Sequence, residues 1–162
     1  MRAVAAILES AFDRDLAIVE AMLGRLPQGS DDWAPGPCEL TAAELASHLV
    51  ESCAGVCACF HRLHPERLAH LEALRGRFAP EPRPVADSRA RIAECRVVVA
   101  EAFALVGDAD LPRPIPSIFR PRGEPFLSTL LINWKHVNHH ARQLFGYLKA
   151  LGVPVATGDL YG

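Results

Sequence analysis

The sequence has 162 residues, of which 50% are hydrophobic and 22% are charged, and its formal net charge is -2 at pH 7. This length predicts a single domain, residues 1–162, with its own core and the composition of a soluble globular protein. The slight acidity and the scattered arginines exclude the basic footprint of a nucleic-acid-binding protein.

The N-terminal segment and the apolar runs bear on cellular location. The apolar run Ala3–Leu8 is followed at once by Glu9 and Asp13, which is too short and too acidic a pattern for a signal peptide. No apolar run approaches the roughly 20 residues that span a bilayer. We therefore expect a cytoplasmic protein that does not interact with membranes.

The first predicted helix runs from about Val4 to Leu26 and ends at Pro27 and Gly29. Apolar residues recur along it at steps of three and four, which places one apolar stripe against a core. The stripe consists of Leu8, Phe12, Leu16, Val19, Leu23 and Leu26.

The second predicted helix follows a capping box, in which Thr41 is the N-cap and Glu44 comes three residues later. The helix extends from about Ala42 to His61 or beyond. Its inner side is expected to carry Leu45, His48, Leu49, Ser52, Val56 and Phe60.

The connection that follows is long, and only part of it can be helical. Glu66–Phe78 fits a short helix, whereas the prolines at positions 80, 82 and 84 exclude a regular helix after it. A third long helix is expected from an N-cap at Asp87 or Ser88 to about Val106. Gly107 then has the position of a glycine that ends a helix in the left-handed conformation.

The last connection, residues 108–124, is rich in proline and arginine, and within it Ile115–Arg120 can form a short extended piece. Pro125 suits the first turn of a fourth helix that runs to about Leu151, before Gly152 and Pro154. Four amphipathic helices of this length pack as an all-α four-helix bundle, here with long second and third connections.

Three histidines are the chemically most informative residues. His136 and His140 are four residues apart, which places them on one face of the fourth helix, about one turn apart. With His48 from a facing helix they complete a three-histidine metal site that keeps open coordination positions. We expect the three imidazoles to converge inside the bundle.

The residues alone leave other interpretations open. A histidine on an apolar helix face, such as His48, can be a hydrogen-bonded core residue instead of a ligand. His139 competes with His140, although neighbouring helical residues point about 100° apart and do not bind one ion together. A carboxylate-bridged di-iron site is excluded, because it needs Glu-x-x-His motifs that the sequence lacks. The remaining histidines, His61, His64 and His70, are expected at the surface.

Five cysteines are present, and their odd number argues against a disulfide framework. Small buried thiols are the main interpretation, and one reactive thiol near the metal is the alternative. The five are Cys38, Cys53, Cys57, Cys59 and Cys95.

Five segments resemble motifs of one known family: Trp33–Pro35, Leu40–Leu49, His136–Leu144, Tyr147–Pro154 and Asp159–Gly162. The third segment, His-Val-Asn-His-His-Ala-Arg-Gln-Leu, is similar to a His-x-x-His-His-Arg-Gly-Gln-Leu signature. Along nearly its whole length, the chain resembles the DinB-like (DinB/YfiT) family of metal-binding four-helix bundles.

The resemblance implies an up-up-down-down bundle, a homodimer, and a divalent metal such as zinc, nickel or iron bound by His48, His136 and His140. Some relatives act on low-molecular-weight thiols or hydrolyse related conjugates, so a small-molecule thiol is the implied substrate class. One departure concerns the arginine of the signature: Ala141 takes its place, and Arg142 follows one position later, rotated by about 100°.

Further candidates surround the expected ligands. Gln143, Tyr147 and Arg142 are candidates for catalysis, with bundle packing as the alternative for the first two. Glu44 and Asn133 are candidates for holding the outer ring nitrogens of the histidines.

Two functions fit these residues. The first is a metal-dependent thiol S-transferase or hydrolase, in which Arg120 and Arg122 either hold a substrate carboxylate or are solvated loop charges. The second is a non-catalytic dimeric metal-binding or stress-response module whose metal is structural or absent. In the second case the segment Val153–Gly162 folds back over the bundle or across a partner subunit.

Overall fold

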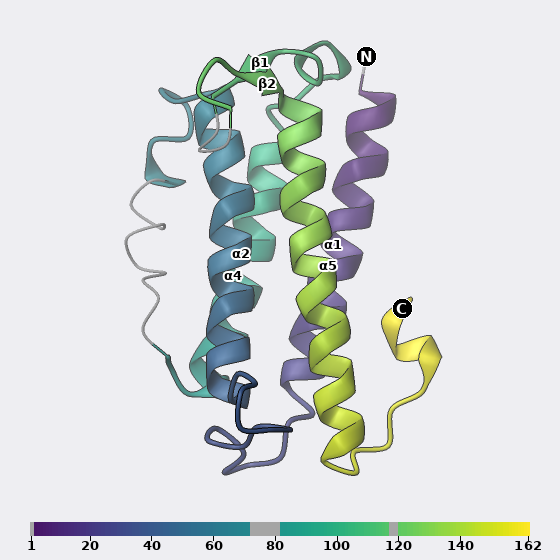
Figure 1. Cartoon of the computed structure of the whole chain (residues 1–162). Helices are drawn as coiled ribbons and strands as arrows, with labels where there is room; N and C mark the ends of the chain where they lie inside the picture. The colour runs from purple at the N-terminus through teal and green to yellow at the C-terminus, as the bar shows by residue number, and fades with distance from the viewer. Residues whose placement is uncertain (1, 72–81, 117–119) are drawn as a thin grey trace.

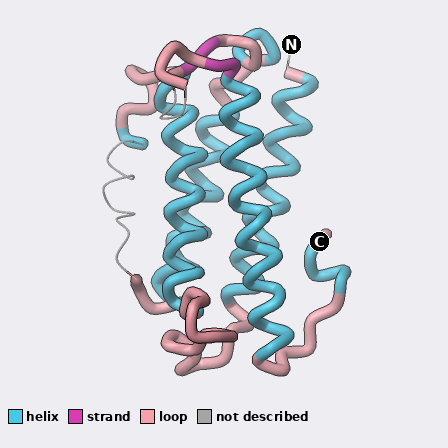
Figure 2. Tube along the Cα trace, in the orientation of Figure 1, coloured by secondary structure: helices cyan, strands magenta, loops and turns pink. Residues whose placement is uncertain are grey.

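A computed structural model describes residues 2–71, 82–116 and 120–162. Within these ranges the chain is mainly helical, with short strands at one end of the bundle and two short 3-10 turns (Figures 1 and 2). The prediction of an all-α bundle is confirmed. The elements in chain order are α1 (Ala3–Leu23), α2 (Ala42–Leu63), α4 (Val85–Phe103), η1 (Asp108–Asp110), β1 (Pro114–Ile115), β2 (Glu124–Pro125), α5 (Phe126–Ala150) and η2 (Thr157–Leu160).

The directions of the long helices differ from those that the resemblance implied. α1 and α5 run one way, and α2 and α4 run the other way (Figure 1). The end of α4 therefore lies beside the start of α1, where Arg2 donates to the carbonyl oxygens of Phe103 and Val106. The order is up-down-down-up and not up-up-down-down. The second connection joins the end of α2 to the start of α4, which lie at opposite ends of the bundle, and its length permits this order (Figure 1).

Local sequence determines where α2 begins. The Thr41 hydroxyl accepts a hydrogen bond from the Glu44 backbone N–H at 3.2 Å, and the Glu44 carboxylate accepts one from the Thr41 N–H at 2.7 Å. This is the predicted capping box, and it satisfies two N–H groups that the helix leaves unpaired.

A tertiary contact determines where α4 begins. The helix starts at Val85, and the prediction of an N-cap at Asp87 or Ser88 is wrong. The Val85 N–H donates to a carboxylate oxygen of Asp31 at 2.8 Å, so the cap comes from the connection between α1 and α2. A cap more than fifty residues away leaves no local sequence pattern.

Two glycines predicted near helix ends behave differently. Gly107 has φ of -108°, so the predicted left-handed conformation is wrong; α4 ends at Phe103, and the Val106 N–H bonds back to it in a turn. Gly152 has φ of +75°, directly after the last turn of α5, as a terminating glycine requires.

Two shorter predictions are tested only in part. In the predicted helix Glu66–Phe78, residues 66–69 form turns and a bend, residues 70 and 71 are helical, and residues 72–78 lie outside the described ranges. In the predicted extended piece Ile115–Arg120, residue 115 belongs to β1, which pairs antiparallel with β2, and residues 117–119 lie outside the described ranges.

The core lies between the four helices and holds α2 firmly beside α5. The predicted stripe of α1 is buried except for Leu26, which is half-buried. Phe60 of α2 stacks edge-on against Phe103 of α4 and Phe126 of α5, with ring centroids 4.8 and 5.3 Å apart. Aromatic pairs of this geometry add to the free energy of simple burial.

The last residues fold back along α1 of the same chain (Figure 1). The Asp159 carboxylate forms an ion pair with Arg25 at 2.9 Å, and Arg25 also donates to the carbonyl oxygen of Pro154. Of the two placements expected for this segment, the chain adopts the one over its own bundle. None of the described helices combines the length and the apolar character needed to cross a bilayer.

Candidate metal centre

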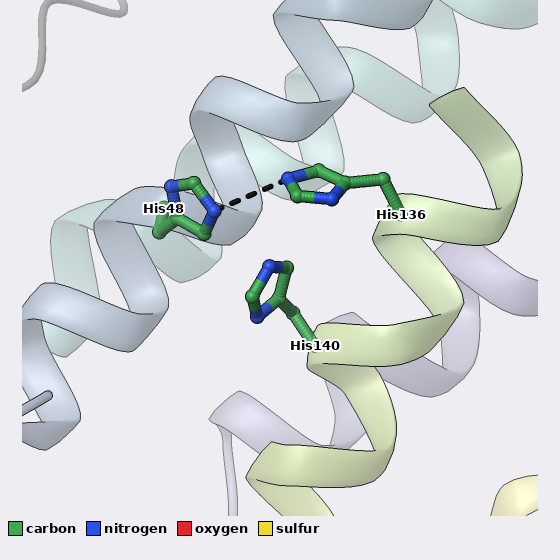
Figure 3. Close-up of side chains that lie close together, drawn as sticks. All are labelled: His48, His136 and His140. Carbon is green, nitrogen blue, oxygen red and sulfur yellow. Dashed lines mark hydrogen bonds between the residues drawn. The ribbon is translucent and has the colours of Figure 1, made fainter. Parts of the chain in front are cut away.

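The three predicted histidines lie together at the seam between α2 and α5 (Figure 3). His48 projects from the second turn of α2, and His136 and His140 project from successive turns of α5. The ring centroid of His48 is 5.2 Å from that of His136 and 4.4 Å from that of His140. One nitrogen from each ring lies within 4.8 Å of the other two.

The separation of these nitrogens suits a shared metal ion. The Nε2 atoms of His48 and His136 are 3.2 Å apart. Two imidazole ligands of a tetrahedral ion, each about 2.0–2.1 Å from it, lie about 3.3 Å apart. Within the described part of the chain, no other group of three histidine, cysteine or acidic side chains brings one ligand atom each so close together. The donor set therefore fits a divalent ion.

The outer nitrogens of two of the rings are held by acceptors on the same helices. Nδ1 of His48 lies 3.1 Å from a carboxylate oxygen of Glu51, and Nδ1 of His140 lies 3.0 Å from the amide oxygen of Gln143. An acceptor on the outer nitrogen orients a ligating histidine and leaves the inner nitrogen free for the metal. Both acceptors follow their histidine by three residues.

The acceptors expected from the sequence serve other purposes. Glu44 is occupied in the capping box with Thr41. Asn133 donates to the Thr129 carbonyl oxygen at 2.9 Å and to the Cys59 sulfur at 3.4 Å. Glu51 was not among the expected acceptors, although the spacing His-x-x-Glu, which places both side chains on one helix face, points to it.

Gln143 continues into a hydrogen-bonded chain. Its amide nitrogen lies 3.5 Å from the Tyr147 hydroxyl oxygen, and the Tyr147 hydroxyl donates to the Leu40 carbonyl oxygen at 2.7 Å. The Tyr147 ring also packs edge-on against Trp33, with ring centroids 5.4 Å apart. Burial raises the pKa of Tyr147, which keeps the phenol protonated and able to donate. Gln143 and Tyr147, both candidates for catalysis, thus hold the outer nitrogen of His140 in place.

The electrostatic surroundings favour neutral imidazoles. Partial burial, and then the nearby His48 and His139, lower the pKa of His136. Burial also lowers the pKa of His140, against the opposing hydrogen bond from Gln143. A neutral ring has a lone pair for a metal, whereas a protonated ring has none.

The site is a surface seam and not an interior cavity. His136 is exposed, and His48 and His140 are half-buried, so the expectation of a site inside the bundle is wrong. The physical reason is that the core between α2 and α5 is filled by apolar side chains, and the histidines occupy the outer edge of the contact. One side of the site is consequently open to solvent.

A glycine brings the two helices close beside the site. A Cβ atom built on Gly55 of α2 would lie 2.6 Å from the side-chain oxygen of Asn133 on α5. Real Cβ atoms do not approach an oxygen so closely, so a larger residue at position 55 would require the Asn133 side chain or the helix to shift. Gly55 lies two turns after His48, and Asn133 lies about one turn before His136.

The remaining candidates lie elsewhere. Arg142 is on the opposite side of α5, where with Arg14 and Tyr161 it lines a cavity of about 190 Å³, so the expectation that it works beside the histidines is wrong. His139 is exposed and outside the group of converging nitrogens. Arg120 and Arg122 precede α5, whose first residue is ten positions, or about 15 Å, from His136.

Four of the five cysteines are buried, and Cys38 is exposed. The thiol of Cys95 hydrogen-bonds with those of Cys53 and Cys57 between α4 and α2. The bond with Cys95, followed by burial, raises the pKa of Cys57 well above its usual value, and burial raises that of Cys59 to about 12. Cys57, Cys59 and Cys95 therefore stay protonated, which agrees with the interpretation of small buried side chains and not with that of a reactive thiol.

Comparison with known proteins agrees with this architecture. Solved structures include a similar fold, a DinB-like protein (YjoA) from Bacillus subtilis, which matches 91% of this chain and 93% of its own with a TM-score of 0.70 and 15% identity. No curated protein matches the sequence of this chain. The model of the DinB superfamily matches residues 11–144, which include all three converging histidines. The chain therefore belongs to the DinB superfamily.

Proposed function

We propose that the chain is a metal-dependent enzyme in which His48, His136 and His140 hold one divalent ion, zinc, nickel or iron. The convergence of one nitrogen from each ring at an open seam carries the proposal. Structural zinc sites use four protein ligands, whereas catalytic sites use three and leave a position for water or substrate. Membership of a metal-associated superfamily supports the same assignment.

Small-molecule thiol transfer is the reaction class that we place first, followed by hydrolysis. A divalent ion held by neutral imidazoles supplies a nucleophile near neutral pH, because it lowers the pKa of a water or thiol that binds it. Glu51 and Gln143 keep the rings oriented, and the exposed side at His136 gives a small substrate access. Thiol transfer comes first because a thiolate needs no further general base.

The test is turnover of a panel of low-molecular-weight thiols with a model electrophile, measured with metal-loaded protein, chelator-treated protein and the His140→Ala variant. The proposal predicts thiol consumption that depends on both the metal and His140. Tight metal binding without turnover of any thiol or thiol conjugate would favour the alternative, a non-catalytic metal-binding module.

A further inference from the structure

A chain of hydrogen bonds behind His140 has a fixed direction. It begins at the Leu40 carbonyl oxygen, which can only accept, so the Tyr147 hydroxyl must donate its proton there. The Tyr147 oxygen is then free to accept from the Gln143 amide nitrogen at 3.5 Å. This turns the amide oxygen of Gln143 toward His140, and that oxygen can only accept. The proton between them therefore belongs to Nδ1 of His140.

The carboxylate of Glu51 acts on His48 in the same way. An ionised carboxylate can only accept, so Nδ1 of His48 carries the proton in their 3.1 Å hydrogen bond. In the neutral rings of His48 and His140, Nε2 consequently has a free lone pair. Both inner nitrogens are in the state that a metal needs.

His136 is in the opposite state. Its Nε2 lies 3.2 Å from Nε2 of His48, which has a lone pair and no proton. Two lone pairs facing each other at this distance repel, so the hydrogen bond requires a proton on Nε2 of His136. That proton occupies the lone pair with which Nε2 of His136 would bind the ion; the dashed line in Figure 3 marks the contact between the two Nε2 atoms.

We propose that Glu51, Gln143 and Tyr147 are positioning residues that fix His48 and His140 as Nδ1–H tautomers in advance, whereas His136 must change tautomer when the metal binds. The inference rests on the proposed metal site. It adds that two of the ligands are ready before the metal binds and that the third changes when it binds. His136 loses the proton on Nε2 to solvent and gains one on Nδ1 from solvent, so the exchange releases no net proton. Because His136 is exposed, solvent is available for this exchange.

The tautomers can be read directly by long-range 1H–15N NMR of histidine rings, at a pH where the three are neutral. For the metal-free protein we expect Nδ1–H signals from His48 and His140 and an Nε2–H signal from His136. Addition of zinc should convert His136 alone to the Nδ1–H form. A metal-free His136 already in the Nδ1–H form, or a His140 in the Nε2–H form, would overturn the proposal.

Matched variants separate an acceptor from a merely structural side chain. Gln143→Leu and Glu51→Leu remove the acceptors and should weaken zinc binding roughly 10–100-fold in a chelator competition. Gln143→Glu keeps an acceptor and should retain both the tautomer and near wild-type affinity. Tyr147→Phe keeps the ring against Trp33 but lets the Gln143 amide turn, so part of the His140 signal should move to the Nε2–H form.

Glu44→Ala is the control, since it removes a carboxylate of the same helix whose hydrogen bond goes to the helix cap and not to a histidine. It should lower the melting temperature and leave the zinc affinity unchanged. Wild-type affinity in both leucine variants would refute the positioning roles while leaving the metal site intact. Failure of the wild-type protein to bind zinc would instead refute the proposed function.

Discussion

Helix α2 presents ligand-type side chains on two opposite faces, and the two groups are in opposite chemical states. Toward α4 it buries Cys53 and Cys57 against Cys95. The hydrogen bond with Cys95, followed by burial, raises the pKa of Cys57, and the hydrogen bond with Cys53, together with burial, raises that of Cys95. Toward α5 it presents His48 beside two imidazoles at a half-exposed seam.

The difference shows that clustering of ligand atoms does not by itself make a metal site. Thiols bind metals as thiolates, and burial without a nearby cation disfavours the charged form. Imidazoles bind as neutral rings, and partial burial favours that form, as the lowered pKa values of His136 and His140 indicate. Burial thus contributes to keeping the thiols protonated and to keeping the imidazoles neutral.

The largest effect that the comparison predicts is on metal binding. His48→Ala or His140→Ala should abolish stoichiometric binding, because two imidazoles are left at an exposed surface, and the loss should exceed the 10–100-fold expected for an outer acceptor. Cys95→Ala, on the other face, should bind like wild type. Metal content after dialysis measures this, with circular dichroism to check that each variant folds. Metal loss in Cys95→Ala alone would reverse the assignment.

Thiol reactivity tests the cysteine cluster, which lies on the other face of α2. In the native protein Cys38 alone is exposed among the five cysteines, so iodoacetamide should add to one thiol rapidly. The other four should react only after unfolding, because they are buried. Mass spectrometry of intact and denatured protein counts the adducts. Rapid alkylation of Cys57 or Cys95 in native protein would contradict the assigned state of this cluster.

The spacing of α2 and α5 is the next point to perturb. Gly55→Ala should lower the free energy of unfolding by about 1–3 kcal/mol and weaken metal binding, since its Cβ forces Asn133 away. In the Asn133→Ala background the same change should cost less, because the clashing oxygen is gone. Chemical denaturation of the four proteins completes a double-mutant cycle. Additive effects would show that the two residues do not limit the helix spacing.

The smallest expected effect is on the pH dependence of stability without metal. Folding lowers the pKa values of His136 and His140, so below their unfolded value of about 6.5 the unfolded chain binds protons that the folded chain does not. Stability should therefore fall as the pH drops from about 7.5 to 5.5. Thermal melts of the His136→Gln/His140→Gln variant should show a shallower fall; an equal slope would mean that these rings do not titrate as described.

Local patterns predicted what local forces control. The apolar periodicity of α1, the Thr41–Glu44 capping box and the terminating Gly152 all appear as expected, because each depends on neighbours within one or two turns. The start of α4 was wrong because its cap, Asp31, belongs to another connection. The helix directions were wrong because they came from the resemblance and not from a pattern in the residues.

In the candidate site, too, local spacing predicted some features and tertiary contacts determine the others. Spacing along α5 was enough to pair His136 with His140, and the resemblance added His48. The acceptors depend on which rotamer each histidine adopts against the facing helix, so Glu51 was missed and Glu44 was chosen instead. The side on which Arg142 lies follows from its 100° rotation, and the cavity that it lines requires the folded C-terminal segment.

The central claim is that one ion binds between α2 and α5, and anomalous diffraction from crystals of zinc- or cobalt-loaded protein tests it most directly. The account predicts a single strong peak at the seam, about 2.0–2.1 Å from Nε2 of His48, His136 and His140. A peak at the cysteines of α2 and α4, or no peak within reach of all three imidazoles, would contradict it.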